Sequence, residues 1–317
     1  MKFVFFDIEC ACVSKNYAKI CAFGYVVCDE KFNILQQEEI LINPRGDFHL
    51  TGGHGSKGLV LPYEYDSFKQ YPKFKAQYAK IKSLLEDKDS YIFGHSTIND
   101  VKYLNLETRR YKLPVFNFNF WDTQLIYMTV TGQFEHQFGL EYIANRMSVD
   151  YTPHSAVNDA YATMRVLQAI CERENSGFLQ LVEKYGLCAG SLGKGRIIQP
   201  VSTPQKEYVN AKIRKKREIS RIRIKFNNFL NTKKPLSCGR LQGKRFIFSR
   251  EIEDNLSLSK PLVDALYACG GEYHTKLDKC NVYVAAENDQ TFRARTAQSS
   301  PEIDIINMDE LRELING

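Results

Sequence analysis

The chain has 317 residues with a net charge of +6, of which 44% are hydrophobic and 12% aromatic. This composition is that of a globular protein, and the length favours two domains with separate cores. No apolar run approaches the ~20 residues of a membrane span, so we expect no membrane partner. Asp7 interrupts the first apolar run, so we expect no signal peptide.

The nine cysteines include no C-x-x-C pair. An odd number of cysteines without such pairs indicates reduced thiols, so we expect a cytoplasmic protein. Four of them lie near the N-terminus, at positions 10, 12, 21 and 28. Their spacing does not match a zinc finger, and small apolar thiols on neighbouring strands are typical of a core.

The first predicted strand, residues 3–6, ends at Asp7 and Glu9. Two further strands, 20–28 and 34–42, flank a turn-like stretch and predict an antiparallel meander. Because side chains alternate along a strand, Asp7 and Glu9 point to the same side of the sheet. Both carboxylates can then reach one metal ion.

The middle of the domain is predicted to alternate helices and strands. The glycine-rich stretch 52–58 has no phosphate-loop spacing and is expected to be a loop. Apolar residues spaced by three and four predict a helix over 74–85, followed by a buried strand at 91–93. Asp100 then opens a helix, and a short strand ends at Asp122, which we expect to be a helix N-cap rather than a ligand. We expect His95 and His136 to be structural or surface residues.

His154 and Asp159 come next, at the start of a predicted helix with an apolar face through Leu167. Taken singly, Asp100 and Asp159 are ordinary acids of a first helical turn, and His154 is an ordinary loop residue. Taken together with Asp7 and Glu9, they form a different set. Four carboxylates and one imidazole are what a two-metal phosphodiester hydrolase needs, since carboxylate oxygens neutralise two divalent cations and an imidazole accepts the proton of the attacking water.

Three segments resemble the motifs of the DEDDh exonucleases, which include replicative proofreading subunits. They are Phe6-Asp7-Ile8-Glu9, the stretch from Gly94 through Asp100 to Leu104, and His154 to Asp159. The resemblance covers roughly the first 175 residues and implies an exonuclease domain over 1–185. Cys10, Ser96 and Asn99 depart from the family pattern, at positions that contact the terminal nucleotide or pack behind it.

This resemblance implies an α/β fold with a ribonuclease-H-like mixed sheet and flanking helices. It implies two divalent cations, Mg²⁺ or Mn²⁺, held by Asp7, Glu9, Asp100 and Asp159, with His154 as general base. The expected activity is 3′-to-5′ hydrolysis of nucleic acid, above all of single-stranded DNA 3′ ends in replication or repair. An exoribonuclease that trims RNA and a non-catalytic nucleic-acid-tethering adaptor are the alternatives.

A basic linker, partly helical, is expected over residues 186–236. Residues 194–234 contain 13 basic and 2 acidic side chains, a net charge of +11. Such a segment beside a phosphodiesterase site favours contact with a nucleic-acid backbone, and a merely solvated linker is the alternative. The candidate phosphate-binding residues are Lys215, Lys216, Arg217, Arg221 and Arg223.

Residues 237–317 resemble a BRCT domain, a small C-terminal α/β module. The resemblance lies in two short apolar strands, a helix between them, and the pair Gly270-Gly271, which permits a tight turn before the second strand. The phosphate-binding hydroxyl of that family would fall on Ser249, with Arg293 as its cationic partner, but Arg250 replaces the usual glycine. We therefore expect this domain to bind a protein partner rather than phosphate.

Overall fold

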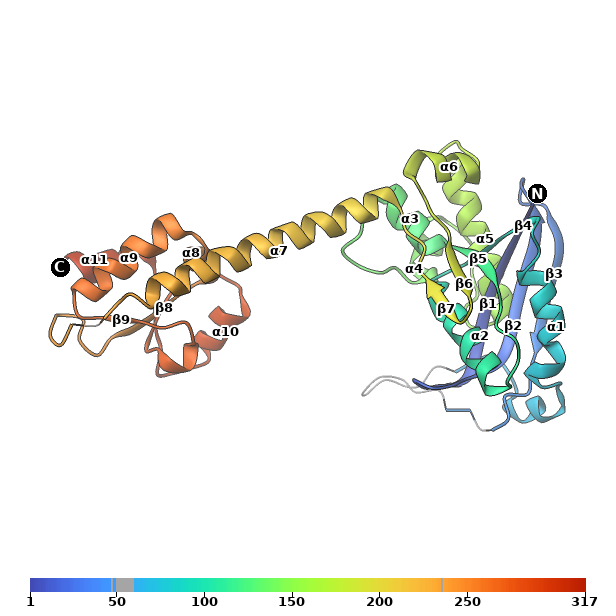
Figure 1. Ribbon diagram of the computed structural model, residues 1–317, viewed down its shortest axis with the longest axis horizontal. Helices are drawn as coiled ribbons and strands as arrows, with labels where there is room; N and C mark the ends of the chain where they lie inside the picture. Colours follow the sequence, from blue (N-terminus) through green and yellow to red (C-terminus); the bar gives the residue numbers. More distant parts are fainter. Residues whose placement is uncertain (47, 50–59, 235) are drawn as a thin grey trace. The chain divides into compact units, whose positions relative to one another are not determined.

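The computed structural model describes residues 1–46, 48–49, 60–234 and 236–317. They form two compact units, residues 1–209 and 210–317 (Figure 1). The glycine-rich stretch 52–58 lies outside the described residues. None of the helices in the described ranges is long and apolar enough to cross a bilayer, and all nine cysteines are free.

Unit 1, residues 1–209, is built on a seven-stranded sheet in the order β3-β2-β1-β4-β5-β6-β7. Strand β1 is antiparallel to β2 and parallel to β4, β5 is parallel to β4, and β6 and β7 add antiparallel strands. This mixed α/β sheet agrees with the ribonuclease-H-like architecture expected from the sequence. The strands are β1 (Lys2–Val13), β2 (Ala18–Asp29), β3 (Ile34–Leu41), β4 (Ser90–Gly94), β5 (Phe118–Asp122), β6 (Gly190–Gly193) and β7 (Arg196–Ile198).

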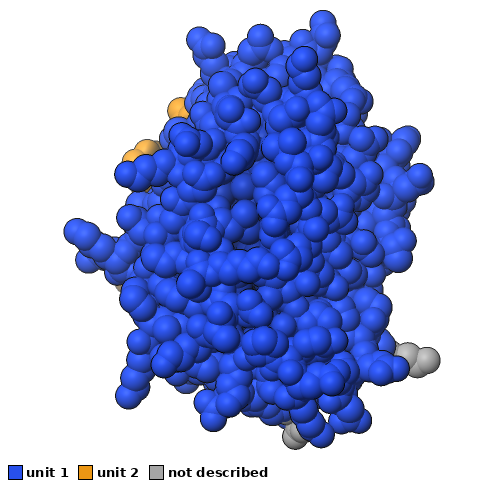
Figure 2. All heavy atoms as spheres, turned by 90° about the vertical axis from the view of Figure 1, so that its right-hand side faces the viewer, with its two compact units in different colours: residues 1–209 blue, residues 210–317 orange. Residues whose placement is uncertain are grey.

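Helices cover both faces of this sheet. On one face lie α1 (Phe74–Leu85) and α2 (Ile98–Arg110), which share a core with Val4 and Phe6 of β1. The other face carries α3 (Thr123–Thr131), α4 (Leu140–Arg146), α5 (Ala156–Arg173) and α6 (Phe178–Tyr185). Edge strand β3 and helix α1, at the right of Figure 1, lie on the side of unit 1 that faces the viewer in Figure 2. A 3₁₀ helix, η1 (Tyr65–Gln70), precedes α1.

The alternation of side chains along β1 decides where its acidic residues point. Phe3 and Phe5 pack in the core on the α5 side of the sheet. Asp7 and Glu9 continue the same alternate set and therefore face α5 as well.

Strand β1 is longer than predicted, so Asp7 and Glu9 lie within it and not at its end. Its pairing with β2 continues to Val13 opposite Ala18, through register shifts at Glu9/Cys10 and Cys10/Cys12. Such irregularities bend a strand without ending it. Asp7 and Glu9, which suggested a strand end, instead lie within the strand next to this bend.

The expected linker, residues 186–236, is divided between the two units. Its first part forms β6 and β7, which extend the sheet of unit 1. Most of the remainder is a 28-residue helix, α7 (Thr203–Leu230), and the unit boundary falls between Val209 and Asn210 within it. Phe226 of this helix is fully buried in the core of unit 2. The structural units are therefore 1–209 and 210–317, and the three-segment division remains a sequence-based expectation.

Unit 2 contains a four-stranded sheet in the order β11-β10-β8-β9, in which every pair is parallel. Gly270, with a φ of +81°, lies between α9 and β9, at the tight turn expected for the glycine pair. The elements are β8 (Arg245–Phe248), α8 (Arg250–Asp254), α9 (Leu256–Ala268), β9 (Glu272–Tyr273), η2 (Leu277–Lys279), β10 (Val282–Val284), α10 (Phe292–Gln298), β11 (Asp304–Ile306) and α11 (Met308–Asn316).

Candidate metal centre

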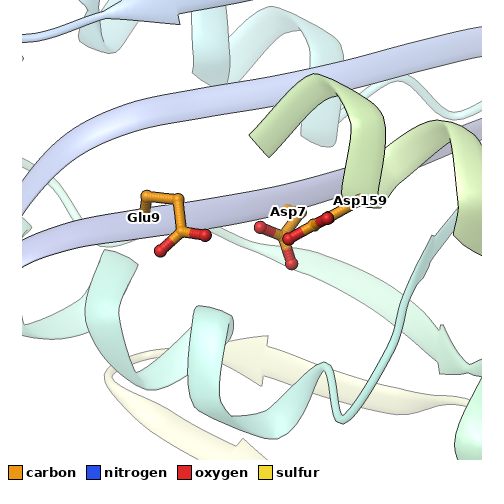
Figure 3. Close-up of side chains that lie close together, drawn as sticks. All are labelled: Asp7, Glu9 and Asp159. Carbon is orange, nitrogen blue, oxygen red and sulfur yellow. The ribbon is translucent and has the colours of Figure 1, made fainter. Parts of the chain in front are cut away.

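Three carboxylates meet where β1 faces the start of α5. Asp7 and Glu9 come from β1 and Asp159 from the first turns of α5, and one oxygen of each lies within 4.8 Å of the others. Figure 3 shows the Asp7 and Asp159 carboxylates side by side, with that of Glu9 turned toward them. Asp159 is buried, and Asp7 and Glu9 are half-buried. The cluster thus has one side within the protein and another open to solvent.

Gly24 of β2 allows α5 to approach this closely. It lies directly opposite Asp7 in the β1–β2 ladder. A Cβ atom at Gly24 would lie 2.0 Å from the carbonyl carbon of Ala156 and 2.1 Å from the amide nitrogen of Val157. The first residues of α5 therefore rest on the backbone of β2, which places Asp159 over Asp7.

A second sheet residue, Glu39 of β3, caps the same helix from outside. Its Oε1 accepts hydrogen bonds from the Val157 amide at 3.2 Å and from the Ser155 hydroxyl at 3.1 Å. The Tyr63 hydroxyl donates to Glu39 Oε1 at 2.8 Å and accepts from the Ala156 amide at 3.2 Å. These contacts satisfy two helix-terminal amides that lack a partner within the helix. Glu39 belongs to no sequence motif, and sequence reasoning missed it.

Tyr151 and His154 lie in the segment that leads into α5. The Tyr151 hydroxyl donates a 2.8 Å hydrogen bond to Asp159 Oδ1 and so fixes the orientation of that carboxylate. His154 is exposed and has a φ of +74°, a left-handed conformation that is uncommon for a residue with a side chain. It is close enough to Asp159 for its charge to lower the pKa of that carboxyl, against the larger effect of burial, which raises it. Sequence reasoning identified His154 and missed Tyr151.

Asp100 enters the site from the opposite face of the sheet. It lies in the first turn of α2, is 6% exposed, and is not among the three residues grouped within 4.8 Å. After burial, the charge of Asp100 is the largest cause that raises the pKa of Asp7. The structure therefore brings Asp100 into electrostatic contact with the cluster while leaving it at the edge.

The four carboxylates oppose one another's ionisation. Burial and the charges of Asp159 and Glu39 raise the pKa of Glu9 to about 8. Burial, followed by neighbouring acids, raises the pKa of Asp7 well above its usual range, and burial also raises the pKa values of Asp100 and Asp159. Such a set is costly without a compensating cation. Oxygen ligands of this kind suit a hard divalent cation such as Mg²⁺ or Mn²⁺.

Asp122 and His95 have structural roles, as the sequence suggested. Asp122 caps α3, because its side chain accepts hydrogen bonds from the amides of Gln124 and Leu125. The ring nitrogens of His95 lie 3.1 Å from Thr123 Oγ1 and 2.9 Å from the Phe138 carbonyl oxygen. Burial lowers the pKa of His95 to about 4, so the ring is neutral at pH 7.

The candidate phosphate-binding residues of α7 divide into two groups. Arg223 forms two 2.8 Å hydrogen bonds with the carboxylate of Asp254, so its guanidinium already has an acidic partner. The other four side chains are exposed: Lys215, Lys216, Arg217 and Arg221.

The residues that would bind phosphate in unit 2 are engaged with other groups. Ser249 is 1% exposed, and its hydroxyl accepts a hydrogen bond from the Ile252 amide at the start of α8. Arg293 donates to the Phe248 carbonyl oxygen at 2.8 Å and pairs with the buried carboxylate of Glu253 at 2.5 Å. Neither group is available to an incoming phosphate without breaking these contacts.

Comparisons with known proteins give one family. The model of the exonuclease family RNase_T matches residues 4–167, more than half of the 317 residues. No curated protein matches the chain. The matched range contains all four acidic residues and His154.

Several solved structures are similar to part of the chain. A 3′-exonuclease that recognises a histone mRNA stem-loop is 14% identical, with a TM-score of 0.49, over 64% of this chain and 91% of that one. A full-length 3′-exonuclease is 13% identical, with a TM-score of 0.49, over 64% of this chain and 67% of that one. Exonuclease I of E. coli bound to a dT13 oligonucleotide is 16% identical, with a TM-score of 0.42, over 55% of this chain and 42% of that one.

Proposed function

The chain belongs to the exonuclease family RNase_T, and we propose that it is a metal-dependent 3′-to-5′ exonuclease. It hydrolyses phosphodiester bonds at nucleic-acid 3′ ends, with single-stranded DNA in replication or repair as its substrate. One observation carries the proposal: Asp7, Glu9 and Asp159 present carboxylate oxygens within 4.8 Å of one another. Three acids this close match a divalent-cation site that leaves positions open for water and phosphate.

We assign the ligands as follows. Asp7, Glu9 and Asp159 would hold one cation, and Asp7 together with Asp100 would hold a second. When bound, such a pair of ions lowers the pKa of a water and neutralises charge on the attacking and leaving oxygens. The Tyr151 hydrogen bond to Asp159 Oδ1 leaves the second oxygen of that carboxylate for the cation.

His154 is the general base in this proposal. Its exposed ring lies in the turn immediately before α5, so that it can reach a water at the cluster and pass the proton to solvent. A general base must lie within reach of the water that it deprotonates and must then release the proton.

The exposed basic residues of α7 contact the phosphate backbone in this proposal. Arg223 is left out of this set because it pairs with Asp254. The contacting residues are Lys215, Lys216, Arg217 and Arg221. Phosphate contacts of this kind supply affinity without sequence preference.

We further propose that residues 237–317, the part of unit 2 that follows the basic segment, form a BRCT-like module that binds a protein partner. Its parallel sheet and the turn at Gly270 support the resemblance. The internal contacts of Ser249 and Arg293 argue against phosphate as the ligand. Residues 235–317 carry 10 basic and 13 acidic side chains, a net charge of −3, which disfavours a nucleic-acid partner. A chain that ends at Val209 also lacks the exposed basic residues of α7, so it should bind short single strands more weakly but keep its turnover at saturating substrate. A large loss of that turnover by the folded truncated protein would contradict this division.

The activity is tested with matched DNA and RNA oligonucleotides that carry a label at the 5′ end. The full chain with Mg²⁺ or Mn²⁺ should shorten the DNA stepwise from its 3′ end, and EDTA should stop the reaction. Faster digestion of the RNA would favour the exoribonuclease alternative. Binding of both strands without cleavage would favour the non-catalytic adaptor.

A further inference from the structure

A cleft in unit 1 lies on the helix turn that carries Asp100. It has a volume of about 290 Å³ and is bounded by the first turns of α2 and α3 and by the segment that follows β7. Asn99 in its wall is the residue directly before Asp100. The Ser96 amide donates to Asp122 Oδ1 at 3.1 Å, which ties the beginnings of α2 and α3 together at this point. The cleft is therefore built on the same helix turn that carries Asp100.

The rim of this cleft is rich in carboxamides. Gln124 is the one rim carboxamide with an intramolecular partner, since its amide donates to the Phe138 carbonyl oxygen at 2.7 Å. Asp122, which also lines the cleft, accepts hydrogen bonds from the amides of Ser96 and Gln124. The side chains of the other Asn and Gln residues of the rim, and of its lysine, form no hydrogen bond or ion pair with any part of the chain that the structure describes. These are Asn99, Lys102, Gln137, Gln199 and Gln205.

Beneath the rim the lining is apolar. Leu125, Met128 and Pro200 are buried, and Ile98 is half-buried. The cleft thus combines an apolar surface with uncommitted groups that can both donate and accept hydrogen bonds.

A nucleobase has the complementary construction. Its faces are apolar and planar, and its edges carry donors and acceptors that Asn and Gln side chains can pair with. The volume lies at the lower end of the ~300–1,000 Å³ typical of small-ligand sites, which suits one planar group and not a length of strand. Lys102 adds one positive charge, as a neighbouring phosphate would require.

We propose that this cleft binds one nucleobase of the single-stranded substrate, within a few nucleotides of its 3′ end. The proposal rests on the proposed function, because it assumes that the strand lies across the metal centre. It identifies Gln137 and Gln199 as residues that position the strand through a base, whereas the exposed basic residues of α7 contact only phosphates.

The test is a scan with oligonucleotides that lack a single base at successive positions from the 3′ end. Dissociation constants are measured by fluorescence anisotropy with the full-length Asp159→Asn protein and Mg²⁺, so that the strands stay intact. Removal of the base that enters the cleft should weaken binding by about 5- to 150-fold, the range for loss of one bound base. Removal of bases at other positions should have a smaller effect.

Two variants assign that effect to the cleft. The double variant Gln137→Ala and Gln199→Ala should lose most of the sensitivity at that position, and circular dichroism checks that it is folded. Gln37→Ala, an exposed carboxamide on β3 outside the cleft, should retain it. A flat scan, or a sensitive position that the double variant leaves unchanged, overturns the proposal while cleavage of ordinary strands still supports the exonuclease function. A wild-type protein that neither binds nor cleaves oligonucleotides overturns both.

Discussion

Replacing Glu39 by glutamine or by alanine separates two effects of this side chain on the metal centre. Its Oε1 accepts from the Val157 amide, the Ser155 hydroxyl and the Tyr63 hydroxyl, at 3.2, 3.1 and 2.8 Å. Its negative charge also raises the pKa values of Asp7, Glu9 and Asp159. Glutamine keeps an accepting oxygen and removes the charge, whereas alanine removes both.

The two substitutions should therefore differ in stability. Loss of a helix N-cap costs about 0.5–2 kcal/mol, and a half-buried amide left without a partner adds a cost of the same order. Glu39→Ala should lose about 2 kcal/mol of unfolding free energy in EDTA. Glu39→Gln should lose less than half of that, because relief of repulsion with the other acids offsets the weaker capping interaction.

The same pair should differ in cation binding for another reason. Removal of one negative charge near the cluster should reduce Mn²⁺ affinity by about fivefold, or about 1 kcal/mol, in Glu39→Gln. Urea denaturation in EDTA and calorimetric Mn²⁺ titration measure the two quantities. An alanine variant as stable as the wild type would refute the capping role, and unchanged Mn²⁺ affinity in the glutamine variant would refute the electrostatic one.

Four further predictions concern the site and α7. Asp7→Asn or Asp159→Asn should abolish nuclease turnover with the fold intact, and near-normal turnover of either in saturating Mn²⁺ would contradict the two-metal assignment. His154→Ala should reduce kcat by roughly 10²–10⁴ with little change in KM, and a wild-type rate independent of pH between 5 and 8 would remove the general base. In EDTA, the free energy of unfolding should fall as the pH rises from about 5 to 8. Burial and neighbouring acids raise the pKa of Glu9 to about 8, so the folded state binds more protons than the unfolded one over this range. Denaturation at each pH should show this slope, and Mn²⁺ should reverse it. The four exposed basic residues of α7 are Lys215, Lys216, Arg217 and Arg221. Neutralising them should reduce the slope of log affinity against log salt concentration for single-strand binding by roughly 0.7 per lost phosphate contact. An unchanged slope would make α7 a solvated helix.

The parts of the fold that the sequence predicted are those with local signals. Alternation along β1 predicted that Asp7 and Glu9 share a face, and the order of acid and base motifs indicated an exonuclease. The N-cap role of Asp122 was also predicted, and the structure confirms it. Strand alternation, the N-cap and each single motif depend on residues that are close together in the chain, where spacing carries the information.

Non-local pairing explains the parts that were not predicted. Strands β6 and β7 have four and three residues and contain or flank glycines, so they looked like a linker. They are strands because β6 pairs with β5, about 70 residues earlier. Phe226 lies among basic residues in the segment expected to be a linker, yet it is fully buried in the core of unit 2. No local pattern encodes either contact.

Gly24 shows how the metal centre depends on a residue with no functional group. Glycine inside a strand weakens it unless another backbone must come close. Here a Cβ would lie 2.0 Å from the Ala156 carbonyl carbon, a separation that requires the helix or the strand to move. Because Asp7 is the ladder partner of Gly24, any such movement would separate α5 from β1 at the point where Asp159 meets Asp7. The spacing of the three carboxylates is therefore set by an absent side chain on β2 and by the Glu39 cap on β3, neither of which belongs to the motifs that supply the ligands.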